Sequence, residues 1–357
     1  MSPDAAPDPA SDWRPTASQA NLVRRARLLA QTRAFFAARG VLEVDTPLVV
    51  NAAVTDRHIH SAAVDLGAPP GSVQPTGAVP GDVQPTGAVP QRQPLTPAHY
   101  LHTSPEYAMK RLLAAGSGDI YQICHVVRGF EHSPVHNPEF TLVEWYRLGF
   151  ALPALMDEVE ALVRVLLVDR LPGCAPCERV PYREAFGRTL GLDPLECGLQ
   201  ELAAAAHDAG YHATGGRPER DELLDFLMAV VIGPTLGRGG LTFIHGYPAS
   251  QAALARLDPA EPRLAARFEL YCEGLELANG FHELQQPAEQ RARFERDLEE
   301  RRRQGLAVPG IDERLLAALG QGLPDCAGVA LGFDRTLMLA CGAGHIREVL
   351  SFPTQRA

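Results

Sequence analysis

An alternation of apolar and polar residues on both sides of Glu273-Gly274 is the strongest constraint on how this chain can fold. Side chains of a β-strand point to opposite faces in turn, so the pattern in residues 267–283 predicts two strands. Glu273-Gly274 suits a two-residue turn between them. In that register Tyr271 faces Glu276, and Glu269 lies on the same face. The pattern therefore predicts two neighbouring carboxylates on one sheet surface.

Glu269 and Glu276 together suit a magnesium ion. Two like charges repel each other unless a cation lies between them. Hard oxygen ligands that leave room for water and phosphate oxygens fit Mg²⁺ that arrives with a nucleotide. A solvated edge strand with scattered acids explains the same residues, so the hairpin taken alone leaves both interpretations open.

A second segment predicts a strand, a loop and another strand. An apolar run ends at Arg128, a polar loop covers residues 131–138, and an apolar segment resumes over residues 139–146. Arg128 at the entrance of the loop could grip a phosphate with its planar fork, and Phe140 could stack on a base. An ordinary hairpin whose arginine makes a surface ion pair is the alternative.

A third segment, residues 328–335, predicts a strand of small residues that runs into an apolar helix. Gly332 would let a ligand approach the backbone closely. Arg335 at the opening of the helix would add a positive charge to the favourable N-terminal dipole. A glycine needed only for packing is the alternative interpretation.

In this chain order, the three segments resemble the catalytic domain of class II aminoacyl-tRNA synthetases, and lysyl-tRNA synthetases most closely. Residues 41–47, with the helix through Phe35 and Phe36 before them, resemble the family's first motif. Further signatures of the lysine type are residues 103–106, 136–140 and 276–281. The resemblance implies an α+β fold with an antiparallel β-sheet flanked by helices, and a homodimer formed through the first motif.

The resemblance also implies a role for each matching residue in a reaction that uses ATP and Mg²⁺. Arg128 and Arg335 correspond to the catalytic ligands of the α- and γ-phosphates, and Glu269 and Glu276 to the metal ligands. The ATP-binding positions are Arg128, Gly129, Phe130, Glu131, Asn137, Phe140, Glu276, Leu277, Gly332 and Arg335.

The amino-acid pocket of the family corresponds to Ser104, Pro105, Glu106, Tyr146, Asn279 and Glu283. Glu283 and Tyr146 suit the distal ammonium group of the substrate, and Glu106 suits the amine next to the reacting carboxyl group. Two buried ammonium groups require buried carboxylates. Glu144 adds a further charge nearby.

Two positions depart from the family pattern. From the motif-two arginine the family reads Arg-Asn-Glu, whereas this chain reads Arg128-Gly129-Phe130-Glu131, which displaces the glutamate by one residue. We expect Gly129 to let the loop shift so that Glu131 reaches the nucleotide; an apolar adenine contact by Phe130 is the alternative. Ala330 stands where synthetases usually have glycine, and we expect its methyl group to favour a β-amino acid.

The identity of the acceptor is predicted from charge and from length. The first motif begins too close to Met1 to leave room for an N-terminal anticodon-binding barrel. The chain has 33 Lys and Arg against 43 Asp and Glu, and this net charge of −10 disfavours tRNA as a partner. The chain thereby resembles bacterial ligases that attach (R)-β-lysine, or lysine, to a lysine of elongation factor P. A free-standing lysyl-tRNA synthetase-like enzyme and a noncatalytic regulatory paralogue remain the alternatives.

The remaining predictions concern organisation. Residues 1–17 form a disordered tail, residues 18–357 form the catalytic domain, and residues 66–98 form a Pro- and Gly-rich insertion with a near-repeat. Arg301-Arg302-Arg303 is interpreted as a solvated helix face. Neither a signal peptide nor a membrane span of about 20 apolar residues is present in the pattern, so a cytoplasmic protein is expected.

Overall fold

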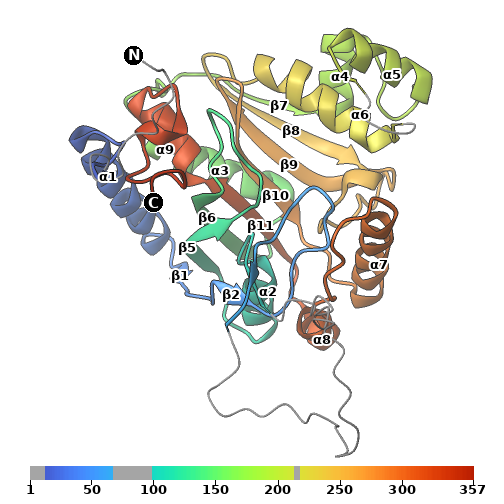
Figure 1. The fold of residues 1–357 in the computed structure, drawn as a ribbon, viewed down its shortest axis with the longest axis horizontal. Helices are drawn as coiled ribbons and strands as arrows, with labels where there is room; N and C mark the ends of the chain where they lie inside the picture. The colour runs from blue at the N-terminus through green and yellow to red at the C-terminus, as the bar shows by residue number, and fades with distance from the viewer. Residues whose placement is uncertain (1–12, 67–98, 213–217) are drawn as a thin grey trace, which may run out of the picture.

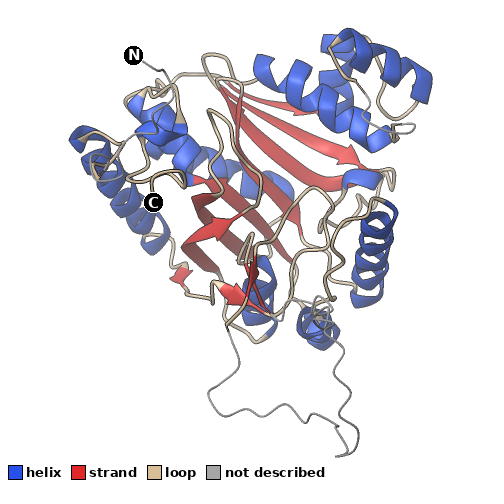
Figure 2. Cartoon of the chain, viewed as in Figure 1, coloured by secondary structure: helices blue, strands red, loops and turns tan. Residues whose placement is uncertain are grey.

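A computed structural model describes residues 13–66, 99–212 and 218–357, in which one large sheet is flanked by helices (Figure 1). The strands of this sheet, which are red in Figure 2 and labelled in Figure 1, lie in the order β1-β5-β6-β11-β10-β9-β8-β7. Their bounds are β1 Leu42–Glu43, β5 Ile120–Val127, β6 Glu139–Leu148, β7 Cys177–Pro181, β8 Leu241–Pro248, β9 Leu264–Cys272, β10 Leu275–His282 and β11 Cys326–Gly332.

The predicted antiparallel sheet is confirmed for the central strands, from β5 to β8. The two edge strands differ, because β1 pairs in parallel with β5 and β7 pairs in parallel with β8. A second, small sheet has the order β2-β4-β3. Its strands are β2 Val49–Val50, β3 Ala63–Val64 and β4 His99–Leu101.

Helices cover both faces of the large sheet within the described residues. Their bounds are α1 Gln19–Ala37, α2 Glu106–Ala114, α3 Leu152–Leu166, α4 Tyr182–Leu190, α5 Leu199–Asp208, α6 Arg220–Leu227, α7 Pro287–Arg303, α8 Glu313–Gly322 and α9 Phe333–Cys341. A π-helical turn, Met228–Ile232, continues α6, so the predicted helical stretch 220–232 is confirmed. No helix in these ranges is long and apolar enough to cross a membrane.

The main hydrophobic core lies between one face of the sheet and the layer formed by α1, α3 and α9. Trp145 on β6 and Phe333 on α9 are fully buried in it. Two smaller clusters cover the ends of the opposite face. One joins β8 and β9 to α4, α5 and α6, and the other joins Tyr146 to α2, α7 and α8. The part of this face that remains between the two clusters carries the predicted site residues.

A buried carboxylate fixes the junction of β11 and α9. Asp334, in the first turn of α9, accepts a hydrogen bond from the backbone N–H of Thr141 at 2.7 Å and pairs with Arg25 of α1 at 2.5 Å. Both partners lie on elements that pack against the start of α9, so Asp334 holds the neighbouring Arg335 in place. A carboxylate in the first turn is also favourable to the helix dipole.

One prediction of organisation, that for Arg301, is wrong, and those for the tail and the insertion stay predictions. Residues 1–12 and 67–98 of the predicted tail and insertion lie outside the described residues. In the part of the predicted tail that is described, the backbone N–H groups of Thr16 and Ala17 bond to the carbonyl oxygens of Ser351 and Leu350. The prediction that Arg301 lies on a solvated helix face is wrong. Arg301 is buried and donates to the carbonyl oxygens of Ala307 and Asp56 at 2.7 Å.

Candidate active site

The predicted hairpin is confirmed, including its register. Tyr271 pairs with Glu276, and the turn residues Glu273 and Gly274 both have positive φ, as a two-residue turn of this kind requires. The sequence did not indicate the bulge between Glu276 and Ala278 that brings Asn279 opposite Glu269. Its consequence is that an amide side chain stands beside the two carboxylates.

Glu269 and Glu276 lie on one face, as expected, and influence each other. Desolvation and the nearby Glu269 raise the pKa of the Glu276 carboxyl group. Arg267, which the sequence did not single out, donates to Glu269 at 2.5 Å and to Oδ1 of Asn279 at 3.2 Å. The hydroxyl of Tyr271 donates to the other oxygen of Glu269 at 2.7 Å. Glu269 is therefore held from two sides, whereas Glu276 is 40% exposed at its side chain.

The two predicted catalytic arginines converge on His136. Arg335 donates to Nε2 of His136 at 2.5 Å and to the carbonyl oxygen of Glu276 at 2.9 Å. Burial, Arg335 and Arg128 together lower the pKa of His136 to about 4. The imidazole is therefore neutral near pH 7 and can accept the hydrogen bond. Arg128 in turn donates to the carbonyl oxygen of Thr103 at 3.3 Å.

Gly129 lets the loop after Arg128 pack closely against the backbone of His60. A Cβ at Gly129 would lie 3.3 Å from the carbonyl oxygen of His60, to which the Gly129 N–H donates at 2.7 Å. Phe130 has φ of 65° and is 85% exposed, with its ring edge-on to His60. Glu131 lies 4.0 Å from Arg128. Glu131 thus turns toward the arginine, while Phe130 points outward.

Four other positions predicted to bind the nucleotide lie in different surroundings. Phe140 has the Arg128 guanidinium over its ring at 5.3 Å. Asn137 is buried, and its amide donates to the carbonyl oxygen of Glu139 and accepts from the N–H of Thr354. The Leu277 side chain lies in the main core, where it is 2% exposed.

Gly332 is the fourth of these positions. It caps α9, and the backbone oxygen of Leu277 lies 3.7 Å from where a Gly332 Cβ would be. The backbone of Leu277, rather than its side chain, therefore faces the start of α9.

Three of the predicted amino-acid-binding residues, Ser104, Glu106 and Tyr146, are joined by hydrogen bonds through Glu144, whereas Asn279 lies apart and bonds to Arg267. Ser104 accepts from the N–H of Glu106 at 3.0 Å and donates to Glu144 at 2.7 Å. Tyr146 donates to the other oxygen of Glu144 at 2.8 Å. Burial raises the pKa of Glu144 to about 8, and Glu106 adds to that effect. Glu283 is 1% exposed, and burial raises its pKa to about 7.

Lys110 is the residue of this cluster that sequence reasoning missed. It lies on α2 and is fully buried, with Nζ 2.6 Å from a carboxylate oxygen of Glu106 and 2.6 Å from one of Glu283. The signal was the spacing of four residues between Glu106 and Lys110, which is usual for an exposed helical ion pair. Only the fold brings Glu283 to the same ammonium group.

Comparisons with known proteins show the family of this chain. The family model of the tRNA synthetases class II (D, K and N) matches residues 8–356. The chain belongs to this class II synthetase family. A Vibrio cholerae protein is 48% identical over 348 residues, which cover 97% of this chain and 99% of that protein. A Pasteurella multocida protein is 43% identical, with 97% and 98% covered. Both relatives are named elongation factor P (R)-β-lysine ligase.

Strand β11 lies between β6 and β10 and forms the floor of the predicted amino-acid site in this class II synthetase domain. Ala330 pairs with Asn279 on one side and with Glu144 on the other, so its methyl group shares their face of the sheet. At Gly328, a Cβ would overlap the ring of Tyr146 and lie 2.5 Å from Oε1 of Glu283. Gly328, which sequence reasoning did not name as a site residue, therefore makes room for two pocket side chains.

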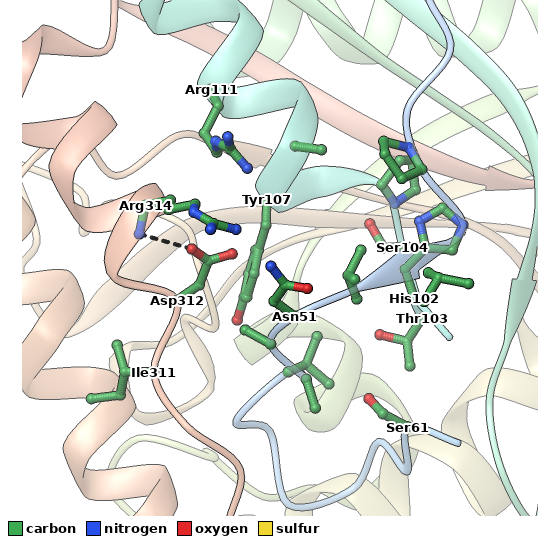
Figure 3. Close-up of a pocket in the computed structure, with 18 of the residues that line it drawn as sticks. Asn51, Ser61, His102, Thr103, Ser104, Tyr107, Arg111, Ile311, Asp312 and Arg314 are labelled. Atoms are coloured by element: carbon green, nitrogen blue, oxygen red, sulfur yellow. Dashed lines mark hydrogen bonds between the residues drawn. The ribbon is translucent and has the colours of Figure 1, made fainter. Parts of the chain in front are cut away.

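A separate cavity of about 360 Å³ borders the site (Figure 3). It lies between the segment after β2, helix α2 and the start of α8, and Figure 3 shows Arg111 and Arg314 at one end and His102 and Ser104 at the other. It shares Ser104 and Pro105 with the predicted amino-acid site, and none of the buried acids Glu144, Glu269 and Glu283 lines it.

Proposed function

We propose that the protein is an ATP-dependent ligase that activates (R)-β-lysine and transfers it to a lysine of elongation factor P. The relatives' names supply the acceptor and the amino acid, and their near-complete coverage of the chain supports the transfer of that activity. The observation that carries the proposal is the charge of the buried cluster around Glu144. Three carboxylates and one ammonium group form it, which gives a formal charge of −2 when all are ionised.

A charge of −2 matches the two ammonium groups of β-lysine. Glu144 and Glu283 have raised pKa values, and a bound cation would relieve the repulsion that contributes to them. Glu283 and Tyr146 are assigned to the distal ammonium group, and Glu106 to the amine near the carboxyl group. Ser104 and Asn279 orient these groups. The Ala330 methyl group in the floor supports a preference for the β-amino acid.

The ATP site is assigned to the opposite end of the same sheet face. Arg128 neutralises the α-phosphate and Arg335 the γ-phosphate, because their guanidinium groups converge from β5 and α9 on the space beside Glu276. Glu269 and Glu276 fit Mg²⁺, since they are two adjacent carboxylates that a cation would stabilise. When bound, the ion adds positive charge beside the phosphate oxygens.

The reaction has two steps. A carboxylate oxygen of β-lysine bonds to the α-phosphorus of ATP, the bond from that phosphorus to the bridging oxygen breaks, and pyrophosphate leaves. The neutral amine of the acceptor lysine then forms an amide with the activated carbonyl carbon, AMP leaves with the bonding electrons, and one proton goes to solvent. No side chain forms a covalent bond in either step, so the domain acts by positioning and charge neutralisation.

Arg335→Met tests the assignment of the ATP end. We expect loss of at least about 100-fold in ATP–pyrophosphate exchange, since removing one charged ligand of a transition state has an effect of this order. Arg291→Met is the matched control, because Arg291 makes a surface ion pair with Glu313 and should leave exchange unchanged. If Arg335→Met were as active as the control, the assignment of Arg335 to the ATP site would be wrong.

We also propose that the enzyme is a cytoplasmic homodimer that does not use tRNA. The dimer is assigned to the first motif, where Leu42 on the edge strand β1 is 55% exposed. Exposed apolar side chains on an edge strand favour pairing with another chain. The net charge of −10 argues against tRNA. Sedimentation of Leu42→Glu should show monomers; an unchanged dimer would place the interface elsewhere.

A further inference from the structure

The buried lysine of α2 takes no part in the reaction described above. Lys110 is among the largest fully buried side chains of the described residues, and its ammonium group contacts Glu106 and Glu283 at 2.6 Å each. Taking a charged group out of water is costly unless it is paired. Burial of such a cation beside two substrate-binding acids therefore calls for an explanation beyond the packing of one helix.

The charged surroundings of Lys110 are almost entirely acidic. Glu106 shares its helix, Glu144 and Tyr146 face the cluster from β6, Glu283 directly follows β10, and Cys326 lies on β11. The side chains of α8 that pack nearby are the leucines of the smaller core cluster. Lys110 is thus the single cation inside this group of described residues, and it contacts two of its three carboxylates.

We propose that Lys110 is a positioning residue that sets the charge of the amino-acid pocket, so that the pocket binds a substrate with two ammonium groups. The inference rests on the proposed assignment of Glu106 and Glu283 to those groups. Three carboxylates without Lys110 would carry −3, one more charge than the substrate neutralises. With Lys110 the sum is −2, and both acids keep fixed orientations toward the substrate.

The same contacts explain how Lys110 acts through Glu283. Its positive charge lowers the pKa of Glu283 and opposes the effect of burial. Glu283 can therefore ionise near neutral pH and accept an ammonium group. Without Lys110, Glu283 would hold a proton to higher pH, and the pocket would lose an acceptor while it also lost the orientation of Glu106.

Lys110→Met tests the inference, because methionine has similar length and no charge. The readouts are KM for β-lysine and KM for ATP in pyrophosphate exchange between pH 6.5 and 8.5. We expect KM for β-lysine to rise at least tenfold at pH 7, with its pH profile displaced upward by about one unit. KM for ATP should stay within twofold. Leu113→Ala, equally buried on the same helix, should lower the melting temperature without moving the profile.

Two further variants keep the outcomes distinct. Lys110→Gln retains hydrogen-bond donors without charge, and it should show the same displaced profile if Lys110→Met does not fold. Glu283→Gln tests the pocket itself. If Glu283→Gln binds β-lysine normally, the proposed pocket is wrong. If Glu283→Gln loses binding while a folded Lys110→Met or Lys110→Gln keeps the wild-type KM and profile, the role of Lys110 is refuted and the pocket stands.

Discussion

The affinity for β-lysine should depend steeply on pH, because the pocket must lose protons before it binds. Glu144 has a pKa of about 8 and Glu283 of about 7, and the ammonium groups of the substrate need both carboxylates ionised. For two such sites the fraction in the ionised form rises about tenfold from pH 7 to pH 8. The dissociation constant should fall by about the same factor, and between one and two protons should leave at pH 7.

Isothermal titration of β-lysine without ATP, at pH 7 in two buffers of different ionisation enthalpy, counts the released protons directly. Glu144→Gln should release about one proton fewer than wild type. The folding stability changes with pH in the opposite direction to the affinity, because both acids have pKa values raised above their ordinary value of 4.5. Their contribution is complete below about pH 4.5 and is lost as the pH rises through 7 and 8. Equal affinity at pH 7 and pH 8, with no proton released, would refute the reasoning.

Further predictions concern the floor strand of the site. Gly328→Ala should cost about 1–3 kcal/mol of unfolding free energy and raise KM for the amino acid, because its methyl group would displace Tyr146 and Glu283; a denaturant titration and exchange kinetics measure both. Gly320→Ala on α8 is the control, since no heavy atom lies within 4 Å of its Cβ, and its stability should not fall. Ala330→Gly should lower the ratio of β- to α-lysine in exchange by about 10-fold or more; an unchanged ratio would remove Ala330 as a determinant.

Local sequence patterns were enough to predict the strands and turns that position the ATP end. The two-residue turn at Glu273-Gly274 and the pairing of Tyr271 with Glu276 follow from a period of two and a turn signal. The step from β11 to α9 at Gly332 was likewise predicted from small residues followed by an apolar helix. Patterns of this kind act over a few residues, and their geometry is nearly independent of the rest of the chain.

Features that depend on distant contacts could not be predicted in this way. Arg301 looks like part of a solvated basic run, yet it is buried because α7 packs against the segment at Asp56. The bulge between Glu276 and Ala278 brings Asn279 opposite Glu269, which a regular two-residue alternation does not predict. Lys110 pairs with Glu283, which is far away in sequence, so its role became visible only when α2 and β10 were placed together.

The central claim is tested most directly by a transfer assay with ATP, Mg²⁺ and labelled (R)-β-lysine, in which elongation factor P and bulk tRNA are offered together. The account predicts that label is found on the protein, that it resists the mild base that cleaves esters of tRNA, and that Arg335→Met abolishes it. Label on tRNA, or ATP–pyrophosphate exchange with no label on elongation factor P, would contradict the account.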